Sequence, residues 1–171
     1  MTVVAIDPQN ALKRFLPHGR EALIKGLWIT RLTPGSSATG YVHFQPGSEY
    51  FRGHFPGSPC LPFHIVLETA HQVMQVAILS ALSDEERAKF RPLCWRWDEP
   101  RLADQILPNE VLKMFAQIRD PQPLALTPES RGIKVIIGDC LGMKVVGEKR
   151  VFTGTAYFSL ALQNKIKSNG V

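Results

Sequence analysis

Residues 62–82, PFHIVLETAHQVMQVAILSAL, decide the fold of this chain. Proline is favourable in the first turn of a helix, because that position has no intrahelical amide bond to lose. The residues that follow it, 63–82, predict a helix of about 20 residues that is roughly 30 Å long. Apolar side chains cover most of its circumference, which is typical of a helix buried on nearly all sides. We therefore expect one long central helix enclosed by the rest of the chain.

The segments around this helix read mainly as strands and turns. Residues 22–32 and 37–44 predict a β-hairpin around the turn signal at 33–35. The other expected elements are one weak helical turn within 8–22, a short helix from a capping box at Ser83 to about Phe90, and strands near 93–97, 110–119, 132–140 and 150–162. One long helix with five or six antiparallel strands is an α+β fold, and we expect a curved sheet wrapped around that helix.

The composition indicates one soluble domain over residues 1–171, with a flexible tail from about residue 163. The apolar share of 44% and the charged share of 20% exclude a disordered chain. The net charge of +5 favours an anionic partner. Three widely spaced cysteines and a start that is unlike a signal peptide predict a reducing, cytoplasmic location, and no stretch is long and apolar enough for a membrane span.

Residues 45–62 precede the helix and are rich in glycine and proline, which predicts a shaped loop with a functional role. This loop carries His54, a residue type that titrates near neutral pH. Glu68 lies in the second turn of the apolar helix, where desolvation would raise the pKa of its carboxyl group. The helix start also offers free backbone amides to a carbonyl oxygen that gains charge. An acid, a base and an oxyanion site suffice to remove a proton beside a carbonyl and expel a β-hydroxyl group.

The string GHFPGSPCLP at 53–62, with Glu68 14 positions after His54 and Gln72 beyond it, resembles the signature of the β-hydroxyacyl-acyl carrier protein dehydratases. These are enzymes of bacterial type II fatty acid synthesis. The resemblance extends along the chain, through the Leu-Pro-His segment at 16–18 and the Leu-Pro-Asn-Glu turn at 107–110.

The resemblance implies a hotdog fold, in which an antiparallel sheet wraps around one long central helix. It also implies a homodimer or a trimer of dimers, with each active site built from two subunits. His54 would act as the base on the α-carbon, and Glu68 of the partner subunit would protonate the departing hydroxyl group. The substrate-binding residues implied by position are Gly57, Phe63, His64 and Gln72, with the amide of Phe63 holding the thioester carbonyl.

The resemblance further implies that the substrate is a 3-hydroxyacyl chain on an acyl carrier protein and that the reaction needs no cofactor. The alternatives are a catalytically silent acyl-binding hotdog protein and a hotdog thioesterase or hydratase acting on acyl-coenzyme A. We expect no nucleic-acid partner, because the aromatic pair at 95 and 97 more often packs in a core or an interface than it stacks on bases. We also expect no membrane partner.

Three positions, 63, 64 and 71, depart from the family pattern. Phe63 stands where glycine is usual, and its ring could crowd the thioester. His64 and His71 replace apolar or small residues, and on a helix they fall within roughly 60° of Glu68. We expect His64 to hydrogen-bond Glu68 and lower its pKa, and His71 to fill a core gap or face the dimer seam. A metal site on these three residues is the less favoured alternative, because one helix rarely supplies all the ligands.

Overall fold

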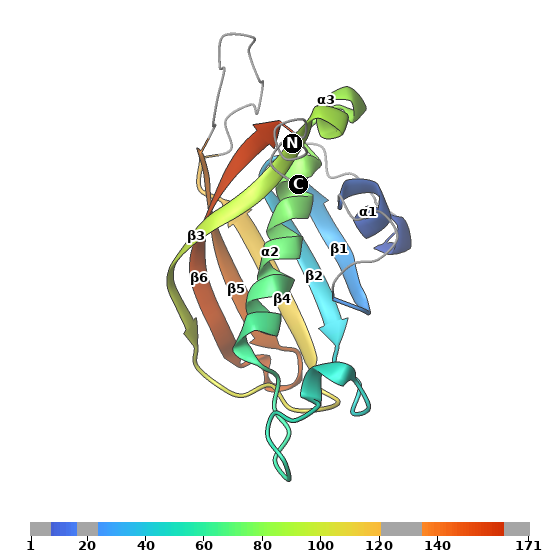
Figure 1. Cartoon of the computed structure of the whole chain (residues 1–171), viewed down its shortest axis with the longest axis vertical. Coiled ribbons are helices and arrows are strands. Elements are labelled where there is room, and N and C mark those ends of the chain that lie inside the picture. Colours follow the sequence, from blue (N-terminus) through green and yellow to red (C-terminus); the bar gives the residue numbers. More distant parts are fainter. Residues whose placement is uncertain (1–7, 17–23, 121–134, 163–171) are drawn as a thin grey trace, which may run out of the picture.

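The computed structural model describes residues 8–16, 24–120 and 135–162, and it shows one antiparallel sheet with a helix across one face (Figure 1). The elements in chain order are α1 (Pro8–Phe15), β1 (Leu27–Thr33), β2 (Ser37–His43), η1 (Glu49–Phe51), α2 (Phe63–Leu79), α3 (Asp84–Lys89), β3 (Phe90–Leu102), β4 (Val111–Ile118), β5 (Val135–Lys144), η2 (Val146–Glu148) and β6 (Arg150–Leu162). The strand order is β1-β2-β4-β5-β6-β3, and every neighbouring pair is antiparallel. The expected α+β fold is confirmed.

Helix α2 and the inner face of the sheet form the core. Seven apolar side chains of α2 have no exposed surface, namely Val66, Ala70, Val73, Met74, Val76, Ala77 and Ile78. Glycine at position 138 lets β5 lie close to the helix, since a Cβ atom there would sit 2.2 Å from Cε of Met74 and 3.1 Å from the carbonyl oxygen of Gln117. Burial of this kind stabilises the fold by roughly 1.5–3 kcal/mol for each large apolar side chain.

Helix α2 begins at Phe63 as expected but ends at Leu79, three residues earlier than predicted. The chain then tightens into turns in which Ala81 and Leu82 donate to carbonyls three residues back. Helix α3 follows, and its capping box is present, with the Ser83 hydroxyl accepting from the Glu86 amide and the Glu86 carboxylate accepting from the Ser83 amide. The sequence prediction of this short helix is confirmed.

Strand β3 is much longer than the predicted 93–97, because it runs from Phe90 to Leu102. It contains Pro92 and Pro100. Because proline has no amide proton to donate to a neighbouring strand, these residues argue against a strand in the sequence. An edge strand tolerates them, because one side of its backbone has no neighbour to bond. Among the described strands, the sheet order places β3 at such an edge, paired with β6 alone.

The three cysteines, Cys60, Cys94 and Cys140, are free thiols, as expected from their spacing. Burial raises the pKa of the Cys94 and Cys140 thiols. Among the described helices, none combines the length and the apolar character needed to cross a membrane. The predicted flexible tail lies outside the described residues.

Candidate active site

The loop before α2 is shaped by its own hydrogen bonds. The amides of Phe55 and Ser58 donate to each other's carbonyls at 3.3 and 3.1 Å, and the Cys60 amide donates to the His54 carbonyl at 2.8 Å. Gly53 and Gly57 adopt φ angles of 78° and 80°, which other residues rarely adopt. The predicted shaped loop is therefore confirmed, and it holds its backbone in one defined path.

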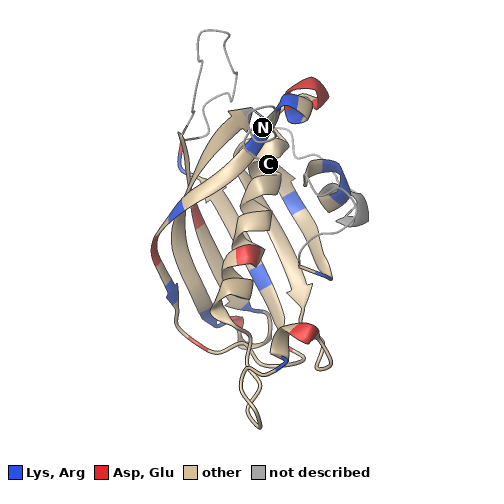
Figure 2. Ribbon diagram, viewed as in Figure 1, with Lys and Arg blue, Asp and Glu red and all other residues tan. Residues whose placement is uncertain are grey.

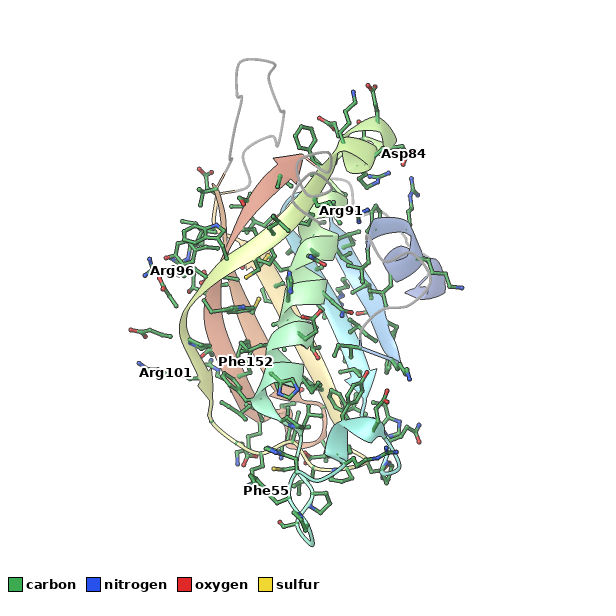
Figure 3. The ribbon with its side chains drawn as sticks, viewed as in Figure 1. Phe55, Asp84, Arg91, Arg96, Arg101 and Phe152 are labelled. Atoms are coloured by element: carbon green, nitrogen blue, oxygen red, sulfur yellow. The ribbon has the colours of Figure 1, made fainter. Side chains whose placement is uncertain are left out.

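His54 lies in this loop and is half-buried. Its ring stacks on the ring of Phe55, with centroids 4.2 Å apart and planes 27° from parallel. Phe55 is 57% exposed and lies in the loop that projects below the N-terminal end of α2 in Figure 3. The imidazole is therefore carried at the same end of the molecule as the start of α2.

The start of α2 supplies backbone donors. Pro62 is the N-cap residue, and its side chain makes no capping hydrogen bond. The amides of Phe63 and His64 precede the first residue that can reach an intrahelical carbonyl, so they can donate to a ligand. The Phe63 ring packs against the core, with its centroid 6.2 Å from that of the buried Phe152. Figure 3 labels Phe152 beside the lower half of α2.

Glu68 is the one charged residue of α2, and its side chain is 28% exposed. Gln72 donates from Nε2 to Oε1 of Glu68 at 2.8 Å. His71 Nδ1 lies 3.3 Å from the other oxygen, Oε2. In Figure 2 the ribbon of α2 is tan apart from one red band, in agreement with its single acidic residue. The two neighbours contact different oxygens, so they hold the carboxyl group from both sides.

The expected partnership of His64 with Glu68 is wrong, since the hydrogen bond comes from His71. Side chains of an α-helix lean toward its N-terminus, so a residue at i+3 reaches back over residue i. The His64 side chain is exposed, whereas the His71 ring packs on Phe158 and is held beside Glu68. The expectation that His71 fills a core gap or faces the dimer seam does not include this hydrogen bond. The spacing of three residues between Glu68 and His71 is the signal that could have found this contact.

The structure therefore brings some predicted residues together and separates others. Glu68 and Gln72 meet, and His71 joins them. Gly57 and His64 are exposed near the start of the helix, and His54 lies in the loop before it, on a different element from Glu68. Within residues 8–16, 24–120 and 135–162, no group of three or more His, Cys, Asp or Glu side chains could hold a metal ion.

Comparison with known proteins gives a consistent family assignment. A family model described as a FabA-like domain matches residues 19–129. A 3-hydroxyacyl-[acyl-carrier-protein] dehydratase FabZ from Moorella thermoacetica is 28% identical over 151 residues, which cover 88% of this chain and 94% of that protein. A protein of the same name from Clostridium botulinum is 32% identical over 105 residues, which cover 61% of this chain and 70% of that protein.

Solved structures match the fold at low identity. A hypothetical thioesterase with coenzyme A from Streptococcus pneumoniae has a TM-score of 0.58 and 8% identity, over 82% of this chain and 89% of that one. The sigma28-regulated virulence protein Cj0977 from Campylobacter jejuni has a TM-score of 0.60 and 10% identity, over 88% of this chain and 95% of that one. At such identities the likeness shows the fold alone, and that fold is the hotdog fold.

Proposed function

This chain belongs to the FabA-like domain family, and we propose that it dehydrates a (3R)-3-hydroxyacyl chain on an acyl carrier protein to the trans-2-enoyl product. The observation that carries this proposal is the Glu68 carboxyl group held between His71 and Gln72 on an otherwise uncharged helix. The names of the Moorella and Clostridium relatives support the reaction and the carrier. The product would serve fatty acid synthesis or a related lipid or polyketide pathway.

The proposed reaction divides its proton transfers between two side chains. His54 removes a proton from the α-carbon, and Glu68 gives a proton to the departing β-hydroxyl group, which leaves as water. The Phe63 amide at the start of α2 donates to the thioester oxygen, where negative charge gathers as the α-proton leaves. Gly57 and His64 lie near this point and would line the entrance for the substrate arm.

The sheet edge supports the proposal that two chains complete the site. Within the part of the chain that the structure describes, one edge of β3 has no neighbouring strand, and β3 exposes 43% of Leu93 and 53% of Trp95. An open edge with large apolar side chains favours pairing with another strand. We infer a homodimer in which His54 of one chain meets Glu68 of the partner subunit. A trimer of such dimers is the larger assembly that we expect.

An acidic carrier protein fits the basic excess of the sequence, but some of the cations have other roles. Lys144 bonds to both Asp104 and Glu110 at 2.9 Å, and its side chain is only 13% exposed. Lys149 reaches Asp104 at 3.1 Å. These two lysines therefore fix the end of the β5–β6 hairpin. Exposed Arg52 and Arg150 are better candidates for the carrier surface.

The test is turnover of a 3-hydroxyacyl thioester, followed by the absorbance of the enoyl product. We expect product from the wild type and a loss of at least about a hundredfold in His54→Ala and in Glu68→Gln, because each change removes one proton-transfer group. Saturable acyl binding without product would support the silent alternative instead. Released thiol without enoyl product would support a thioesterase.

A further inference from the structure

We propose that His71 is a positioning residue that holds the proton-bearing oxygen of Glu68 in place for the reaction. This inference rests on the proposed function, because it assigns a role in the delivery of the proton by Glu68. His71 does not touch the reacting atoms in this account. It acts through the carboxyl group that does.

The hydrogen bonds identify which oxygen of Glu68 carries the proton. The Gln72 amide nitrogen donates to Oε1 at 2.8 Å, and this bond favours Oε1 as the carbonyl oxygen of protonated Glu68, because a carbonyl oxygen accepts more strongly than a hydroxyl oxygen. The acid proton of Glu68 therefore belongs on Oε2. This is the oxygen that lies 3.3 Å from Nδ1 of His71.

An imidazole suits this place because it can match both states of the carboxyl group. When Glu68 is ionised, a neutral ring with its proton on Nδ1 donates to Oε2. When Glu68 is protonated, the same Nδ1 proton is donated to a lone pair of the Oε2 hydroxyl group, and the Oε2 proton is left to point at the departing group. The ring thus keeps a hydrogen bond to Oε2 before and after the proton leaves, and it stabilises the negative charge that forms there.

The surroundings of His71 fix the ring itself. Its centroid lies 5.2 Å from that of Phe158, at 44° between the planes, and Phe158 has no exposed surface. The ring nitrogen Nε2 is buried and has no hydrogen-bond partner among the described residues. Burying a nitrogen without a hydrogen-bond partner costs free energy. The described hydrogen bond of this ring is therefore the one made by Nδ1. An alanine here would avoid that cost but would lose the hydrogen bond to Oε2.

Three substitutions at this position separate positioning from packing. The side-chain nitrogen of asparagine can take the position of Nδ1 of His71. The side-chain nitrogen of glutamine lies closer to the position of Nε2, and alanine replaces neither nitrogen. For His71→Ala and His71→Gln we expect kcat to fall about tenfold to a hundredfold with KM nearly unchanged, since a misplaced acid slows the chemical step and leaves binding intact. His71→Asn should recover most of kcat. Thermal unfolding of all three variants shows whether each folds.

The proposal is overturned if His71→Ala keeps the wild-type kcat, if His71→Asn is as slow as His71→Ala while both fold, or if KM alone changes. A second measurement does not depend on turnover. The ¹⁵N resonance of His71 Nδ1 should shift between the wild type and Glu68→Gln, and an unchanged resonance would also contradict the contact. A wild type that forms no enoyl product would instead overturn the proposed function, while the Nδ1 resonance would still report on the contact.

Discussion

Two carboxylates of this molecule, Glu68 on α2 and Asp139 on β5, are held in different ways. Asp139 accepts two hydrogen bonds of 2.8 Å from the Arg119 guanidinium and a third of 2.8 Å from the Thr155 hydroxyl. The arginine beside Asp139 lowers the pKa of that carboxyl group. The partners described for Glu68 are an imidazole and an amide, which can accompany a carboxyl group in either protonation state. The arginine therefore favours the anionic form of Asp139, whereas the described partners of Glu68 are compatible with the proton transfer that we propose for it.

The two carboxylates also lie on opposite sides of the sheet. Gly138 and Cys140, the neighbours of Asp139, face α2, because the first lies against Met74 and the second has its Sγ 3.9 Å from the Ala70 carbonyl. Successive residues of a strand point to opposite faces, so Asp139 points away from the helix. The outer face therefore carries ordinary surface ion pairs, whereas the inner side carries the core and the candidate site.

The largest effect that we predict separates the two carboxylates by function. Glu68→Gln should lower the dehydration rate by about a hundredfold to ten-thousandfold, because an amide cannot give up a proton to the leaving group. Asp139→Asn is the matched control, with the same loss of one carboxylate. It should keep the rate of the wild type. Equal losses in both variants would contradict the distinction between the two carboxylates.

A second prediction compares the two sides of the sheet by stability. Met74→Ala should lower the free energy of unfolding by about 2–5 kcal/mol, because it leaves a cavity against Gly138 in the core. Arg119→Met should have a much smaller effect, since the Arg119 and Asp139 side chains are 52% and 50% exposed. Urea unfolding of both variants measures the difference. Similar losses would show that the outer ion pair contributes as much as the core.

The smallest predicted effect is a pH dependence of the outer pair. Because the pKa of Asp139 is lower in the folded chain than in the unfolded one, its contribution to stability is present above the unfolded pKa of about 3.9. That contribution is lost as the pH falls through the folded pKa. The difference in unfolding free energy between the wild type and Arg119→Met should therefore narrow as the pH is lowered from 7. A difference that widens under acid would contradict this sign.

Local signals in the sequence predict much of the fold. Pro62 correctly marks the start of α2, the Ser83–Glu86 capping box marks the start of α3, and the alternating pattern gives β6 with its observed bounds. Each of these features depends on neighbouring residues only. The length of β3 depends instead on its place at the edge of the sheet, where proline is tolerated, and a strand's place is not visible in its own residues.

The sequence also predicts the candidate site only in part. The sequence indicates Glu68 and Gln72 as site residues, and the structure joins them. It suggests the wrong histidine as the partner of Glu68, because His64 and His71 both lie within reach of Glu68 on a helix. The packing of His71 on Phe158, which holds it there, is not visible in the sequence. The proposed meeting of His54 with Glu68 involves two chains, and no local pattern in one chain can determine it.

The central claim is that His54 and Glu68 act across two chains, and mixed dimers test it most directly. The His54→Ala and Glu68→Gln variants carry different tags and are co-expressed. The mixed dimer is then purified through both tags in turn. If each site takes its residues from two chains, one site of the mixed dimer is intact, and about half of the wild-type rate should return. If both residues of a site come from one chain, both sites of the mixed dimer are damaged, and it would be as inactive as either parent variant.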